Sequence, residues 1–165
     1  MPQEYDRVIR RLDEHKVKFV IIGGMAAVSL GVPIVTRDLD VCYRRSKPNI
    51  ANLAKALEPL HPKLRGAPAD LPFKLDAATI DHGCNFTLVT DAGDLDVLGY
   101  ISGLGEYDEV AKDAETLEIY GIKVKVMSLE ALIKAKKAAG RAKDNLQLLE
   151  IEAALRLRRE RPKDL

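Results

Sequence analysis

The sequence predicts an α/β (α+β) protein: a small, twisted mixed β-sheet packed against helices, with a helical C-terminus. Three observations indicate this class. The β-branched, apolar run Val17–Ile22 ends at Gly23-Gly24, which is typical of a buried strand. Two further strand-like runs lie within residues 85–101, on either side of a short turn. From Ser128 the chain has helical periodicity almost to Arg161, divided at Gly140.

The other elements are expected from periodicity and from start and stop signals. Apolar residues three and four apart predict helices, alternating residues predict strands, and Ser46 with Pro48 is typical of a helix start. Four prolines at positions 59–72 predict an irregular segment over residues 61–75. Helices are expected over about 3–15, 25–30, 46–57, 76–80 and 107–114, strands over 34–43, 85–90 and 94–101, and one strand or a small hairpin over 117–126.

Composition and length indicate a single globular domain. The 165 residues are 47% apolar and 31% charged, which excludes a disordered chain. We find no internal repeat or linker and expect one domain over 1–165, with a core of about 15–127 and C-terminal helices of about 128–161. Cys42 and Cys84 are too few for a disulfide framework, and the chain shows neither a signal segment nor an apolar run long enough to span a bilayer. We therefore expect a cytoplasmic protein without membrane association.

The most informative motif is a glycine pair followed by two spaced carboxylates. Gly23 and Gly24 follow the first strand, where backbone N–H groups without neighbouring side chains can approach a phosphate. Asp38 and Asp40 are two residues apart on the next expected strand, so that their carboxylates share one face. Two adjacent carboxylates repel each other unless a cation such as Mg²⁺ binds between them. Tight-turn glycines and acids on an exposed strand edge are the structural alternatives.

A third carboxylate is expected from the strand pair of residues 85–101. Asp94 and Asp96 share a face there, and we favour Asp96 because it lies inside the strand whereas Asp94 adjoins the turn. Neither the GxGxxG motif nor the GK[ST] motif is present, so the sequence supports neither a dinucleotide site of the Rossmann type nor a Walker loop.

Basic residues around Gly140 are candidates for phosphate binding. Lys136, Arg141 and Lys143 lie where one C-terminal helix is expected to end and the next to begin. They could neutralise a triphosphate or a leaving pyrophosphate, since Arg and Lys both bind phosphate oxygens. The alternative is a solvated helix face near a helix C-terminus, where cations are favourable.

In this order, the motifs resemble the DNA polymerase β-like nucleotidyltransferase superfamily, in particular its small stand-alone prokaryotic members related to abortive-infection and toxin–antitoxin nucleotidyltransferases. The resemblance covers roughly residues 15–150 and includes Gly23-Gly24, Asp38-Leu39-Asp40 and Gly93-Asp94-Leu95-Asp96. It implies a nucleotidyltransferase fold with catalytic carboxylates at Asp38, Asp40 and Asp96. It also implies that these carboxylates hold two Mg²⁺ ions, or Mn²⁺, and that Gly23 and Gly24 contact the nucleotide phosphates.

The expected reaction moves a nucleoside monophosphate, with ATP among the candidate donors, from a nucleoside triphosphate to a hydroxyl group and releases pyrophosphate. The acceptor could be RNA, a protein or a small molecule. A catalytically silent nucleotide- or RNA-binding protein is the alternative, acting with a partner protein as in toxin–antitoxin pairs. It is favoured by Met25, which stands where many relatives carry serine. A Mg²⁺-dependent phosphohydrolase is a third possibility, and a homodimer is also possible.

Overall fold

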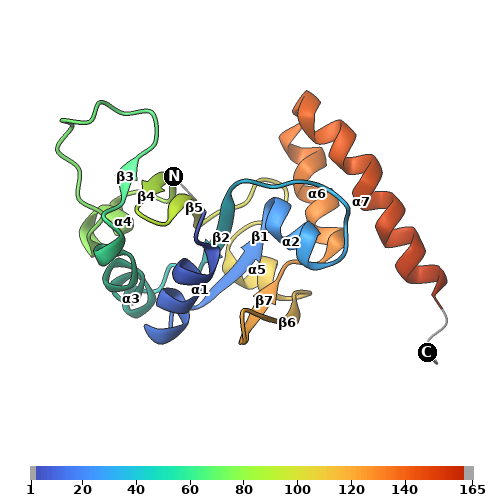
Figure 1. Cartoon of the computed structure of the whole chain (residues 1–165), viewed down its shortest axis with the longest axis horizontal. Helices are drawn as coiled ribbons and strands as arrows, with labels where there is room; N and C mark the ends of the chain where they lie inside the picture. Colours follow the sequence, from blue (N-terminus) through green and yellow to red (C-terminus); the bar gives the residue numbers. More distant parts are fainter. Residues whose placement is uncertain (1–2, 162–165) are drawn as a thin grey trace.

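The computed structural model describes residues 3–161, apart from the side chain of Lys143. Across these residues, seven strands form one sheet in the order β3-β4-β5-β2-β1-β7-β6 (Figure 1). The strands are β1 (Phe19–Ile22), β2 (Leu39–Tyr43), β3 (Lys63–Leu64), β4 (Asn85–Thr90), β5 (Gly93–Leu98), β6 (Glu115–Ile119) and β7 (Ile122–Val126).

The sheet is mixed, as the sequence predicts. The central strand β1 runs antiparallel to β2 and parallel to β7, while β2 runs parallel to β5. This arrangement determines which carboxylates meet, because Asp40 of β2 is level with Asp96 of β5 and with Ile22 at the end of β1. The remaining pairs, β3–β4, β4–β5 and β6–β7, are antiparallel.

Helices pack around this sheet and extend beyond one end of it (Figure 1). Ser46, Asp76 and Ser128 each begin a helix with a side-chain cap that accepts a backbone N–H three residues later. The helices are α1 (Tyr5–Glu14), α2 (Gly23–Ser29), α3 (Lys47–Leu57), the 3₁₀ turn η1 (Glu58–Leu60), α4 (Ala77–His82), α5 (Tyr107–Ala111), α6 (Leu129–Ala139) and α7 (Ala142–Glu160). Gly140 adopts a left-handed conformation between α6 and α7, where the sequence predicts a break.

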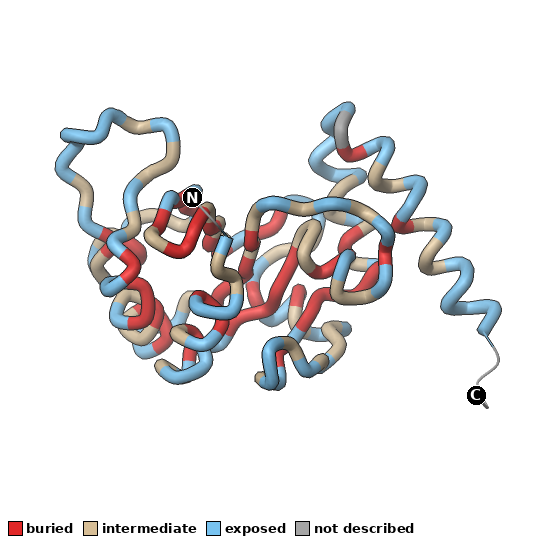
Figure 2. Tube along the Cα trace, in the orientation of Figure 1, coloured by how far each residue is buried: buried red, intermediate tan, exposed pale blue. Residues whose placement is uncertain are grey.

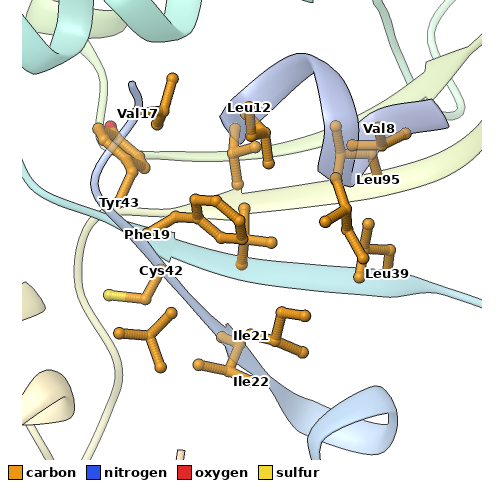
Figure 3. Packing of buried hydrophobic residues seen from close by; sticks show 14 of the residues in the cluster. Val8, Leu12, Val17, Phe19, Ile21, Ile22, Leu39, Cys42, Tyr43 and Leu95 are labelled. Atoms are coloured by element: carbon orange, nitrogen blue, oxygen red, sulfur yellow. The ribbon is translucent and has the colours of Figure 1, made fainter. Parts of the chain in front are cut away.

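The hydrophobic core lies between the central strands and the helices that cover them (Figure 2). All four residues of β1 are buried, and side chains from α1, β2 and β5 pack near them (Figure 3). Val8, Ile9 and Leu12 of α1 are buried in this core. Helix α7 packs chiefly against α6 and lies away from the sheet (Figure 1).

Several element boundaries differ from the sequence predictions. The strand expected over 34–43 begins at Leu39, because residues 33–38 form an extended segment outside the sheet. Helix α2 begins at Gly23, earlier than expected, because Gly23 has a φ of +64° and turns the chain directly out of β1. Strand β5 ends at Leu98, and Ile101 instead forms an isolated bridge with Gly105. The ambiguous segment 117–126 is part of the β6–β7 hairpin.

Along residues 3–161, no helix combines the length and the apolar character that crossing a membrane requires.

Candidate active site

Asp40 and Asp96 lie side by side at one end of the sheet because β2 and β5 run parallel in register. Each of the two carboxyl groups alters the pKa of the other, because they are neighbours. Burial and the neighbouring Asp96 carboxylate raise the pKa of Asp40 to about 7, and burial also raises the pKa of Asp96. Such a pair of acids carries an electrostatic cost that a cation would remove.

Asp38 lies just before β2 in the extended segment. The negative charge of Asp38 contributes to the raised pKa of Asp40, so the two acids lie near each other. The same charge acts on Tyr5 of α1, where burial and then Asp38 raise the pKa of the hydroxyl. Among the described residues, however, no three or more His, Cys, Asp or Glu side chains are arranged as a metal-binding group. Asp40 and Asp96 thus lie next to each other, and Asp38 lies beside this pair.

Arg65 occupies the other side of the carboxylates. Its Nη2 donates hydrogen bonds to Asp96 Oδ1 over 2.8 Å and to the carbonyl oxygen of Leu88 over 2.7 Å. Its Nε lies 3.5 Å from Asp94 Oδ2. The Arg65 charge lowers the pKa of Asp96 and partly offsets the effect of burial. The sequence analysis missed Arg65, because it lies in the irregular proline-rich segment, where no periodicity marks a site residue.

One carboxylate oxygen of the site is suited to binding a cation. Asp40 Oδ1 is a buried side-chain oxygen that has no hydrogen-bond partner among the described residues. A buried acceptor without a partner is costly, and a hard cation such as Mg²⁺ is the kind of group that carboxylate oxygens bind. Asp40 and Asp96 are thus the best-placed candidate ligands, with Asp38 available from the adjoining segment. Asp96, unlike Asp94, is level with Asp40 in the pairing of β2 with β5, which favours Asp96 as the third acid.

The glycine pair allows close packing around Asp40. Gly23 has a φ of +64°, and a Cβ atom there would collide with Asp40 Oδ2. At Gly24, a Cβ atom would stand 2.6 Å from Thr36 Oγ1. Glycine is required at both positions because the backbone passes directly beside side chains of the β2 strand and the segment before it. The glycines and Asp40 therefore form one compact unit.

A cavity of about 410 Å³ opens beside this unit. That volume lies within the range of pockets that bind small molecules and cofactors. Its lining includes Gly23, Gly24, Asp38 and Asp40. Residues of α6 and of the start of α7 also line it, among them the charged residues Lys136, Arg141 and Asp144.

Lys136 and Arg141 both form ion pairs with the carboxylate of Asp144. Lys136 Nζ lies 3.0 Å from Asp144 Oδ1, and Arg141 Nε lies 2.8 Å from Asp144 Oδ2. Asp144 is 1% exposed, whereas the side chain of Lys136 is 11% exposed and that of Arg141 is 59% exposed. Lys136 also donates to Gln147 Oε1 over 2.8 Å. The two basic residues that the sequence predicts thus lie at the cavity, and Asp144 was missed because a lone acid in a basic helix resembles surface charge.

The backbone of Lys143 lies in the first turn of α7, and its predicted contact with phosphate falls outside the described side chains.

The fold matches those of known nucleotidyltransferases. A protein from Thermotoga maritima assigned as a nucleotidyltransferase superposes with a TM-score of 0.54 and 21% identity, covering 91% of this chain and 94% of that chain. The lincosamide antibiotic adenylyltransferase LnuA superposes with a TM-score of 0.61 and 15% identity, covering 92% and 96%. ANT(2")-Ia, solved in complex with adenylyl-2"-tobramycin, superposes with a TM-score of 0.59 and 18% identity, covering 92% and 87%. This chain has the nucleotidyltransferase fold.

A family model described as "Nucleotidyl transferase of unknown function (DUF2204)" matches residues 89–161 of this nucleotidyltransferase-fold chain. The matched region includes Asp96, Lys136, Arg141 and Asp144. It begins at residue 89 and therefore does not include Gly23 and Gly24. A sequence search among curated proteins finds no match. The family match covers the C-terminal part of the chain, and the structural neighbours show the nucleotidyltransferase fold.

Proposed function

We propose that the chain is a Mg²⁺-dependent nucleotidyltransferase that moves a nucleoside monophosphate from a nucleoside triphosphate to a hydroxyl group and releases pyrophosphate. One observation carries the proposal: a single cavity is lined by the glycine pair, by Asp38 and Asp40, and by Lys136 and Arg141. Carboxylates and cations around one cavity are what a metal-bound triphosphate requires.

Each group has a role in this proposal. Asp40 and Asp96, with Asp38, hold the divalent cations, which supply charge stabilisation for the attacking and leaving oxygens. Gly23 and Gly24 line the cavity and let the backbone pass directly beside Asp40 and Thr36, and their backbone N–H groups are the candidates for phosphate contact. Lys136 faces the cavity with its ammonium group held by Asp144 and Gln147, and it is the candidate for binding the leaving phosphates. Arg141, which is more exposed, also lines the cavity.

The donor and acceptor are proposed from the neighbours. LnuA is named an adenylyltransferase, and ANT(2")-Ia was solved with an adenylylated aminoglycoside. We therefore propose ATP as the first donor to test and a hydroxyl-bearing small molecule as the first class of acceptor.

Calorimetric titration with each of the four ribonucleoside triphosphates, in Mg²⁺ and then in EDTA, tests this function. We expect Mg²⁺-dependent binding of at least one triphosphate that Asp38→Asn and Asp96→Asn each weaken by tenfold or more. Asp13→Asn on the exposed face of α1 is the matched control and should bind like the wild type. Release of pyrophosphate on addition of an acceptor distinguishes transfer from hydrolysis. Metal-independent binding, or no binding of any triphosphate, would contradict the proposal.

A further inference from the structure

Tyr100 is an aromatic residue of the cavity lining to which the proposed function gives no role. It lines the same cavity as Gly23, Asp40 and Lys136, and it is 50% exposed. Among the residues that the structure describes, Tyr100 is the only aromatic one in this lining. Ligand cavities are lined largely by hydrophobic and aromatic side chains, with a few polar groups that fix the orientation of the ligand. The half-exposed ring is therefore accessible to a ligand in the cavity.

Asn85 holds the backbone at Tyr100 with three hydrogen bonds. Its Oδ1 accepts from the backbone N–H of Gly99 over 2.9 Å and from that of Tyr100 over 3.2 Å. Its Nδ2 donates to the carbonyl oxygen of Tyr100 over 3.2 Å. The chain also packs tightly here, because a Cβ atom at Gly99 would stand 2.9 Å from Cys84 Sγ. The turn after β5 is thus held in place by the protein itself, and a residue that is already ordered loses less conformational entropy when a ligand binds.

Strand β5 connects Tyr100 to the carboxylates. Asp96 and Leu98 are two residues apart on this strand and therefore share a face, and Asp96 is level with Asp40. Tyr100 follows Asp96 by four residues, which is at most about 14 Å even for a fully extended chain. Leu98, Tyr100 and the buried Ile101 all line the cavity. The lining therefore combines carboxylates and the glycine backbone with an apolar group at the end of β5.

We propose that Tyr100 binds the base of the donor nucleotide by stacking its ring on that base, and that Asn85 is a positioning residue for this contact. The inference rests on the proposed function, because it assigns the remaining part of the same donor. A nucleoside triphosphate has the same division as the cavity lining, since its phosphates are anionic and its base is planar. Stacking on an aromatic side chain is open to every base, because every base has a π face. Tyr100 therefore strengthens the binding of all four nucleotides and does not select one of them.

Calorimetric titration in Mg²⁺ with ATP and, separately, with inorganic tripolyphosphate tests the contact. Tyr100→Ala should weaken ATP binding about fivefold or more, and it should leave tripolyphosphate binding unchanged because that ion has no base. Tyr100→Phe keeps the ring and should bind ATP like the wild type. The matched control is Tyr120→Ala, which removes a tyrosine that is 43% exposed and lies outside the described lining of the cavity. Unchanged circular dichroism shows that each variant folds.

Two further measurements examine the ring and the role of Asn85. Tyr100→Trp provides an optical signal, because the chain has no tryptophan of its own. ATP should quench the emission of this tryptophan, whereas tripolyphosphate should not. In a double-mutant cycle, Asn85→Ala should weaken ATP binding by itself, and this loss should largely disappear in the Tyr100→Ala background because the two residues act through one contact.

The outcomes separate this inference from the proposed function. If the wild type binds no triphosphate, both are overturned. If the wild type binds ATP in Mg²⁺ and Tyr100→Ala binds it equally tightly, the inference alone is overturned and the proposed function stands. Equal weakening of ATP and tripolyphosphate by Tyr100→Ala would also overturn it, because the loss would then not come from the base. Fully additive losses in the cycle would contradict the positioning role of Asn85.

Discussion

Arg65 donates a hydrogen bond from Nη2 to Asp96 Oδ1 over 2.8 Å, and it does so from a segment that precedes the acid by 31 residues. The arginine reaches the acid because β3 pairs with β4 and β4 pairs with β5, so that residues 63–65 are brought across the sheet toward Asp96. The guanidinium supplies positive charge to carboxylates that would otherwise repel one another. A cation bound at Asp96 would share this carboxylate with Arg65.

Arg65→Ala should therefore destabilise the fold and increase its response to metal. We expect a loss of about 1.5–3 kcal/mol in the free energy of unfolding at neutral pH, the range for hydrogen bonds to charged groups. Mg²⁺ should restore more stability to this variant than to the wild type, because it replaces the missing charge. Thermal unfolding with and without Mg²⁺ measures both effects. Lys63→Ala, in the short strand β3 just before Arg65, is the control and should show neither. If Mg²⁺ raised the stability of Arg65→Ala and of the wild type equally, the cation would not be replacing the charge of Arg65.

Asp40→Asn should stabilise the protein at high pH. Burial and Asp96 raise the pKa of Asp40 from 3.8 to about 7, so the folded state holds a proton that the unfolded state releases as pH rises through this window. The contribution of the Asp40 carboxyl to the free energy of unfolding is therefore fully present below about pH 4, and it is lost as the pH rises toward 7 and beyond. The amide cannot ionise, so this part of the loss should disappear in the variant. At pH 8 we expect a gain on the order of 1 kcal/mol or more, since one pKa unit is about 1.4 kcal/mol.

Chemical denaturation at pH 5 and pH 8 without metal measures that gain. Asp13→Asn should give parallel curves to the wild type, because this exposed acid has no such partner. If Asp40→Asn has no stabilising effect at pH 8, the acid pair is not protonated as described.

Gly23→Ala and Gly140→Ala separate backbone strain from crowding. Both glycines have a φ of +64°, but a Cβ at Gly23 would meet Asp40 whereas a Cβ at Gly140 would meet nothing within 4 Å. Gly140→Ala should cost about 1 kcal/mol from the left-handed conformation alone. Gly23→Ala should cost more and should also displace Asp40. Urea denaturation gives the two costs, and equal costs would show that the Asp40 side chain moves away freely.

Asp144→Asn should destabilise the C-terminal helices strongly. The change leaves Lys136, which is 11% exposed, without its charged partner, and breaking a buried ion pair from one side costs about 3–5 kcal/mol. Glu152→Gln removes the exposed pair with Lys137, 3.4 Å apart, and should cost no more than about 1 kcal/mol. Thermal unfolding compares the two, and similar losses would mean that Asp144 is not a buried anchor.

The sequence by itself determined the elements whose causes are local. The apolar run of β1, the caps Ser46 and Ser128 and the break at Gly140 depend on neighbouring residues, and each is confirmed. The mixed sheet also agrees with the sequence prediction. Periodicity could not show where β2 begins, because residues 34–38 have strand-like composition but no neighbouring strand to pair with.

Only the tertiary structure decided which side chains meet. Parallel pairing of β2 with β5 sets Asp40 against Asp96, and pairing of β3 with β4 carries Arg65 to the same acid. Burial then changes the chemistry, since the same aspartate is ionised on a surface and protonated near neutral pH beside Asp96. In the sequence, Asp144 resembles an ordinary surface charge. In the structure it is buried between α6 and α7 and forms an ion pair with Lys136. These contacts and pKa shifts depend on short distances between side chains and on the exclusion of water. Residues that are separated in the sequence come close together and lose contact with water only when the chain folds.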